Sequence, residues 1–168
     1  MTRPTHPSSS SYFKIKLLSK VKFLGFLVGS AGIRPDPKKV EVIRNWPVLK
    51  TVRDVQKFLG FCAFYHCFLV HLSSTAHPLH RLLHKDTKFI WDSSRQLAFD
   101  KLCQAIMKLP TLAFPDPDLP YDLHTDASTF ALGAVLVQNG HPVAFASCSL
   151  TAPEKNYNTT EQECLAIV

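Results

Sequence analysis

The chain has 168 residues, of which 46% are hydrophobic and 19% are charged, and its formal net charge is +6. This length suits one domain or two small ones. No apolar run approaches the roughly 18 residues that a membrane helix needs, and the start of the chain lacks the continuous apolar core of a signal peptide. We therefore expect an intracellular protein, cytoplasmic or nuclear, that is not secreted and has no membrane partner.

The positive charge is concentrated in the first half of the chain. Residues 1–85 hold 14 Lys and Arg and 3 acidic residues, whereas residues 86–168 hold 5 and 10. A basic half suggests a polyanionic partner, and an acidic half suggests either a solvated surface or carboxylates that bind a metal. Because these tasks differ, the sequence predicts two modules.

The basic half begins with a polar tail over residues 1–20, which is expected to be disordered. Residues 21–28 predict a strand or hairpin, and the glycines and serine of residues 29–32 predict the turn that ends it. Asp36-Pro37 then predicts the start of a short helix, because aspartate is a good N-cap and proline suits the first helical position. Pro47 is expected to end this helix.

A longer helix is predicted to begin at Thr51, which forms a capping-box pattern with the aspartate three residues later. Its body is expected over residues 52–72, followed by a connection rich in Ser, His and Pro. Gln56, Gly60 and Phe64 are spaced four apart and therefore share one line of the helix surface. A helical glycine costs about 1 kcal/mol relative to alanine, so either a close contact within the protein or an approaching molecule is expected at Gly60.

The acidic half contains signals for a helix, three strands and a final helix. Asp92 predicts the N-cap of the first helix, which ends before Pro110. The three strands are expected over residues 121–126, 131–138 and 143–148. Asn139-Gly140 joins the last two as a tight hairpin. Thr160 and Glu163 predict the final helix, whose apolar residues run to the end of the chain, so the last domain is expected to be truncated.

Two carboxylates of the acidic half could hold a metal. Asp126 is expected at the end of a strand, and Glu163 in the first turn of the final helix. Mg²⁺ prefers such oxygen ligands, and two metal ions about 4 Å apart can activate water and stabilise a leaving oxygen. Structural roles are open as well, since Asp126 could cap a turn through Ser128, and Glu163 could be the capping partner of Thr160.

Beyond these patterns, residues 21–168 resemble the thumb, the connection and the beginning of the ribonuclease H domain of reverse transcriptases from gypsy-type LTR retrotransposons. The motifs that carry the resemblance are VKFLG (21–25), GIRPDPKKVEVIRNWP (32–47), TVRDVQKFLGFCAFYHCFL (51–69), PLHRLL (78–83), FIWDSSRQLAFDKL (89–102), HTDAS (124–128), LGAVLVQ (132–138) and residues 142–168. They follow one another in the family's order over most of the chain.

The resemblance implies an α+β fold with a boundary between residues 87 and 88. A reverse transcriptase primer-grip hairpin with thumb and connection helices is expected over residues 21–87. The first half of an RNase H-like α/β domain, a β-meander plus a helix, is expected over residues 88–168 and is truncated.

The resemblance also assigns the site residues. Phe23, Leu24, Gly25 and Phe26 correspond to the hairpin that grips the primer strand. The helix from Thr51 corresponds to the thumb helix on the template–primer, with Gln56, Gly60 and Phe64 along the minor groove and Arg53 and Lys57 near the phosphates. Asp126 and Glu163 match the first two Mg²⁺-binding catalytic carboxylates, with Glu161 as an alternative to Glu163.

The parent enzyme implied by the resemblance copies RNA into DNA and hydrolyses RNA in RNA–DNA hybrids. The implied partners are an RNA–DNA hybrid or duplex and the other polyprotein domains, namely palm and fingers, the rest of RNase H, and integrase. The palm aspartates would precede residue 1, and further RNase H carboxylates would follow Val168. We therefore expect a retroelement-derived fragment that is inactive alone. A non-catalytic nucleic-acid-binding module and a non-functional translated remnant are the alternatives.

One part of the thumb helix departs from the family, which usually has arginines where this chain has His66 and Cys67. Cys62 with His66 and Cys67 with His71 form i, i+4 pairs, and further histidines follow at His77, His80 and His84. Thiolates and imidazoles suit zinc, although no CxxC knuckle is present. The odd number of cysteines, mostly in apolar stretches, favours reduced and mostly buried thiols.

Overall fold

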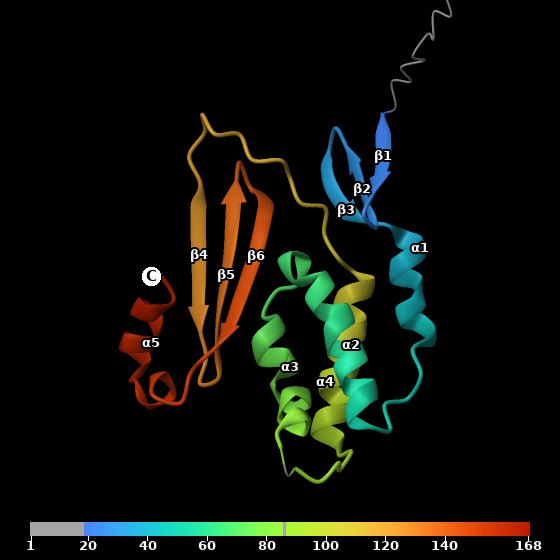
Figure 1. Ribbon diagram of the computed structural model, residues 1–168. Coiled ribbons are helices and arrows are strands. Elements are labelled where there is room, and N and C mark those ends of the chain that lie inside the picture. Colours follow the sequence, from blue (N-terminus) through green and yellow to red (C-terminus); the bar gives the residue numbers. More distant parts are fainter. Residues whose placement is uncertain (1–18, 86) are drawn as a thin grey trace, which may run out of the picture.

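The computed structural model describes residues 19–85 and 87–168, so nearly all of the predicted 1–20 tail lies outside the described residues. Within the described residues there are two three-stranded antiparallel sheets, and a group of helices lies below the first sheet and beside the second in Figure 1. The predicted α+β fold, with a helical module followed by a β-meander and a helix, is confirmed. None of the helices of the described residues is long and apolar enough to cross a membrane.

The first sheet is a meander of β1 (Lys20–Phe23), β2 (Phe26–Gly29) and β3 (Gly32–Pro35). The predicted strand or hairpin is a hairpin of β1 and β2, but strand β3 was not predicted. A contact distant in sequence supports this third strand, because Ile33 and Leu112 exchange two backbone hydrogen bonds of 2.8 Å. Gly32 has a φ of +118°, and a Cβ atom there would collide with the carbonyl oxygen of Leu112.

The short helix after the first sheet is confirmed at its start and differs in its second half. Helix α1 covers Pro37–Val40, and Asp36 caps it by accepting a hydrogen bond from the backbone N–H of Lys38. The chain continues as a 3₁₀ helix, η1, over Glu41–Asn45, where Ile43 is only 3% exposed. Such tightened turns are common at helix ends.

Helix α2 (Val52–Phe64) begins with the predicted capping box, in which Thr51 and Asp54 each bind the other's backbone N–H. The prediction of one helix through residue 72 was wrong. The chain bends at Tyr65, forms the 3₁₀ turn η2 (His66–Phe68), and starts again as α3 (Leu72–His80) with the 3₁₀ turn η3 (Arg81–Leu83).

Helix α3 occupies the stretch that the sequence predicted as a connection. Its Ser, His and Pro residues are typical of loops, but Ala76 and Leu79 are fully buried, and Leu82 of the following turn is nearly so. Burial of these side chains stabilises the helix, since tertiary packing contributes more than intrinsic propensity.

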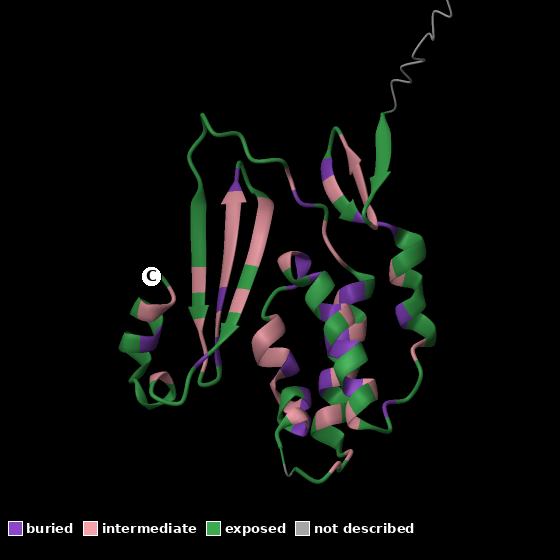
Figure 2. Ribbon diagram, in the orientation of Figure 1, coloured by how far each residue is buried: buried purple, intermediate pink, exposed green. Residues whose placement is uncertain are grey.

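Helix α4 (Ser93–Met107) begins at Asp92, as predicted, and completes the helical core. Figure 2 shows buried residues along α2, α3 and α4. The rings of Phe58 on α2 and Phe99 on α4 lie 4.7 Å apart. The largest fully buried side chains of this core are Val55, Phe58, Cys62, Tyr65, Leu69, Leu79, Leu82, Leu102 and Ile106.

The second sheet contains β4 (Asp122–Ala127), β5 (Ala131–Gln138) and β6 (His141–Ser149), and all three predicted strands are confirmed. Asn139 and Gly140 both have positive φ, as the predicted two-residue hairpin requires. One face of the sheet meets the helical module, where the backbone N–H and the hydroxyl of Ser73 each lie 3.1 Å from the hydroxyl of Ser147.

Helix α5 (Thr159–Leu165) follows the 3₁₀ turn η4 (Glu154–Asn156) and contacts β4. The final helix is therefore present, but its predicted capping pair was wrong. Asn158 accepts a hydrogen bond from the backbone N–H of Glu161, and Glu161 accepts one from that of Asn158. Because asparagine is as good an N-cap as threonine, the helix starts earlier than the Thr160–Glu163 pattern predicted.

Candidate nucleic-acid interface and carboxylate site

The tip of the first hairpin presents apolar side chains to solvent. Phe23 is 63% exposed and Leu24 is 74% exposed. Leu24 and Gly25 form the turn, with φ values of 48° and 87°. A non-glycine residue in this left-handed region pays about 1–2 kcal/mol, and such strain is concentrated at functional sites. The tip therefore has the character of a contact site.

The hairpin tip is anchored to the start of α1. The backbone N–H of Asp36 donates a hydrogen bond of 3.0 Å to the carbonyl oxygen of Gly25. The ammonium group of Lys22 lies 3.0 Å from the Asp36 carboxylate. Its hydrogen bond lowers the pKa of that carboxyl below the ordinary value. Asp36 is therefore held in the ionised form that pairs with Lys22.

Phe26 differs from the other three hairpin residues because its side chain packs inward. Its ring stacks on Phe64 with a centroid separation of 5.2 Å and on Phe68 at 5.5 Å. It also meets the edge of Tyr65. Phe26 therefore supports the hairpin on the helical module rather than presenting a face to a ligand.

The predicted line along α2 is exposed over its whole length. Gln56, Gly60 and Phe64 all face solvent, and Arg53 and Lys57 are exposed on the same helix. A Cβ atom built on Gly60 would meet no described atom within 4 Å. The interpretation that Gly60 permits a close helix contact inside the protein is therefore wrong.

The hairpin tip and α2 meet at one point and form a single surface. A Cβ atom on Gly25 would lie 3.6 Å from Cζ of Phe64, which is ordinary van der Waals contact. We call the combined area the tip–helix surface. It consists of Phe23, Leu24, Gly25, Arg53, Gln56, Lys57, Gly60 and Phe64.

Asp126 lies on β4, opposite Gly133 of β5, on the face of the sheet that meets the helical module. Its Oδ2 atom is 3.7 Å from Nδ1 of His71. The same imidazole covers Gly133, where a Cβ atom would come within 2.8 Å of Nδ1. Sequence reasoning missed this neighbour, because the bend after α2 that directs His71 to the sheet has no clear local signal.

The structural roles considered for the two carboxylates do not hold. The Ser128 hydroxyl donates to the carbonyl oxygen of Ala131 at 2.8 Å, so this turn is closed without Asp126. Glu161 is the capping residue of α5, and this leaves Glu163 exposed in the first turns of the helix. Of the two glutamates, Glu163 is therefore the better candidate for a ligand.

Mg²⁺ prefers oxygen ligands and needs more of them than two carboxylates supply. Asp126 and Glu163 are exposed carboxylates, which suit Mg²⁺. Across residues 19–85 and 87–168, however, no three His, Cys, Asp or Glu side chains are grouped so that they could hold a metal. The described residues alone therefore do not make a metal site.

The same finding removes support for zinc at the cysteines and histidines of residues 62–84. Burial raises the pKa of the Cys62 thiol to about 12 and that of Cys103 to about 11. Cys148 and Cys164 are exposed, so the prediction of mostly buried cysteines holds only for part of the set.

Comparison with known proteins relates this chain to reverse transcriptases of transposons. The RNase H-like domain found in reverse transcriptase matches residues 91–168. The Pol polyprotein of Drosophila melanogaster transposon 297 is 40% identical over 90% of this chain, which spans 14% of the polyprotein. That of transposon 412 from the same species is 39% identical over 96% of the chain, which spans 13% of it.

A solved structure shares the fold. The foamy viral protease-reverse transcriptase in complex with RNA/DNA hybrid has a TM-score of 0.76 and 22% sequence identity, and the match covers 89% of this chain and 21% of that one. The chain is thus homologous to the reverse transcriptase and RNase H region of gypsy-type retrotransposon Pol polyproteins, and its residues 91–168 match the RNase H-like domain found in reverse transcriptase.

Proposed function

We propose that the chain binds an RNA–DNA hybrid or a DNA duplex along the tip–helix surface, as part of a reverse transcriptase and RNase H enzyme. The foamy viral structure of the same fold is a complex with RNA/DNA hybrid, which supports this choice of ligand. The basic first half of the chain supplies the charge that a polyanion needs.

The observation that carries the proposal is the open backbone at Gly60. Apart from its chain neighbours and the backbone of its own helix, no described atom would lie within 4 Å of a Cβ atom on this glycine, although glycine weakens a helix by about 1 kcal/mol relative to alanine. A flat stretch of helix between Gln56 and Phe64 lets a duplex groove come close to the backbone. The exposed tip at Phe23 and Leu24 would contact the same duplex, since Gly25 and Phe64 join the two parts.

Arg53 and Lys57 supply the electrostatic part of this binding. Both side chains are exposed and lie on α2 beside the Gln56–Phe64 line. Contacts of cations with phosphates position a protein on a duplex without reading its sequence. The proposed interface therefore predicts binding that depends on salt and not on base sequence.

At the level of the parent enzyme, we propose copying of RNA into DNA and hydrolysis of RNA in hybrids. Asp126 and Glu163 would be two of the carboxylates of the Mg²⁺ site, completed by ligands outside the described residues. The thumb and connection would cover residues 21–87 and the RNase H-like part residues 88–168. The other polyprotein domains would be the partners of both parts.

Fluorescence anisotropy with a labelled RNA–DNA hybrid tests the interface at several salt concentrations. Each phosphate contact contributes a slope of about −0.9 in a plot of log K against log salt. The double variant Arg53→Ala/Lys57→Ala should bind more weakly and with a slope shallower by about 2. The control Lys101→Ala/Lys108→Ala removes the same charge from α4 and its C-cap. Equal slopes for the two double variants, or no binding at low salt, would refute the proposal.

A further inference from the structure

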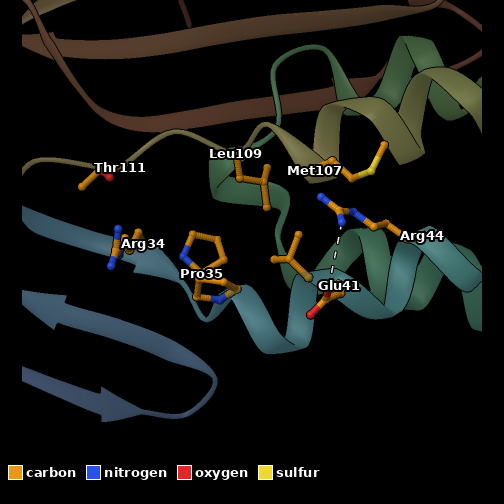
Figure 3. A pocket seen from close by; sticks show the side chains of 9 residues that line it. Arg34, Pro35, Glu41, Arg44, Met107, Leu109 and Thr111 are labelled. Atoms are coloured by element: carbon orange, nitrogen blue, oxygen red, sulfur yellow. Dashed lines mark ion pairs between the residues drawn. The ribbon is translucent and has the colours of Figure 1, made fainter.

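A cavity of about 360 Å³ opens between β3, the α1–η1 segment and the end of α4 (Figure 3). This volume is in the range of small-ligand pockets. None of its lining residues belongs to the tip–helix surface. The residues that matter for its chemistry are Arg34, Pro35, Val40, Arg44, Met107 and Leu109.

The walls of the cavity are fixed before any ligand arrives. The paired hydrogen bonds between Ile33 and Leu112 hold β3 against the segment that follows α4. Ile43, 3% exposed, anchors η1 in the helical core. Because these segments are fixed independently, the cavity is preformed, and a ligand would pay little to organise it.

Two guanidinium groups lie at separate ends of the cavity, with Pro35 and Leu109 between them (Figure 3). Arg34 is exposed and has no ion pair with any residue that the structure describes. Arg44 is 68% exposed on its side chain, and Glu41 is 3.9 Å away, at the outer limit of an ion pair. Both guanidinium groups are therefore available to an anion.

Apolar side chains form part of the surface between the arginines, and Glu41 and Thr111 line the cavity as well. Pro35 is buried, Val40 and Leu109 are half-buried, and Met107 forms part of the wall. The guanidinium fork matches phosphate oxygens, while the accessible side chains of Met107 and Leu109 offer packing area to a planar ring. We propose that this cavity binds a nucleoside monophosphate group, with the phosphate on an arginine and the base against Met107 and Leu109. The proposal does not depend on the duplex interface.

Calorimetric titration of the full 168-residue chain with AMP, adenosine and inorganic phosphate tests this site. AMP should bind at least about tenfold more tightly than adenosine or phosphate, because only AMP uses both the charged and the apolar parts. Arg34→Ala and Arg44→Ala together should weaken AMP binding about tenfold or more, since hydrogen bonds to charged groups are among the strong ones. A parallel titration with a 5′-phosphorylated oligonucleotide shows whether the cavity prefers the phosphorylated end of a strand or a free nucleotide.

The matched control is Arg81→Ala/Lys85→Ala, which removes two charges elsewhere and should leave AMP affinity unchanged. The Arg34/Arg44 variant should alter hybrid affinity no more than this control does, which separates the cavity from the proposed duplex interface. Arg34→Gln/Arg44→Gln serves if the alanine variant fails to fold. AMP binding that is equal in the wild type and the double variant would overturn the proposal, as would adenosine binding as tight as AMP.

Discussion

The ring of Phe26 stacks on the ring of Phe64, with 5.2 Å between centroids and 14° between planes. This contact joins the first hairpin to the end of α2. Phe64 remains 49% exposed, so one of its faces supports the hairpin while the remainder faces solvent. The two parts of the tip–helix surface are therefore held at a fixed distance from each other.

The two phenylalanines that flank the hairpin turn should respond differently to truncation. Phe26→Ala should lower the free energy of unfolding by about 2 kcal/mol, because a packed ring and its stacking contacts are lost. Phe23→Ala should change it by no more than about 0.5 kcal/mol, since Phe23 is mostly exposed, yet it should weaken hybrid binding. Urea denaturation and fluorescence anisotropy measure the two effects. If Phe23→Ala destabilised the fold more than Phe26→Ala, the assignment of Phe26 as packed inward and Phe23 as facing solvent would be wrong.

His77 should make the chain less stable in mild acid. Burial, with Lys155 and Arg81 next in effect, lowers the pKa of this imidazole below 6.5. When folding lowers a histidine pKa, the group's contribution to stability is fully present above the pKa of the unfolded chain. That contribution is lost as the pH falls through the pKa of the folded protein. The free energy of unfolding should therefore decrease from about pH 7 to about pH 5, before most carboxylates titrate.

The control for this effect is His77→Phe, which keeps an aromatic ring against Phe130, 4.5 Å from His77 between centroids. The variant should lose less stability than the wild type over the same pH interval. Part of the pH dependence of the free energy of unfolding should persist in His77→Phe, because burial also lowers the pKa of His80. Identical pH profiles for variant and wild type would show that His77 does not carry the effect.

The 168-residue chain alone should not cleave the RNA of an RNA–DNA hybrid in Mg²⁺. The described residues bring two candidate carboxylates, Asp126 and Glu163, and no group of three potential ligands. A two-metal mechanism needs both ions held in a defined geometry. A gel assay with labelled hybrid checks this expectation, with Asp126→Asn as the control. Cleavage by the wild type that Asp126→Asn abolishes would prove the prediction wrong.

The elements that sequence reasoning found are those with a local signal. Asp92 and the Thr51–Asp54 pair mark helix starts, and Asn139-Gly140 marks a hairpin, because caps and turns act within four residues. Strand β3 and the bend at Tyr65 have no comparable signal. Both depend on packing between distant segments, such as the Ile33–Leu112 pairing.

The same distinction applies to the candidate site. The exposed line of Gln56, Gly60 and Phe64 follows from helical periodicity and was predicted. The inward packing of Phe26 and the proximity of His71 to Asp126 were not, since each requires knowing how the sheets meet the helical module. The cavity at Arg34 and Arg44 likewise exists only where three separate segments meet.

Substitution of Gly60 separates the stability of α2 from duplex binding on its backbone. Gly60→Ala should raise the free energy of unfolding by up to about 1 kcal/mol, because the added methyl group meets no described atom within 4 Å. The bulkier Gly60→Leu should also fold. A duplex lying on the α2 backbone predicts weaker hybrid binding by Gly60→Ala and a larger loss for Gly60→Leu, with no loss for the control Gln104→Leu on α4. Hybrid affinity unchanged in a stably folded Gly60→Leu variant would show that no duplex lies on the α2 backbone.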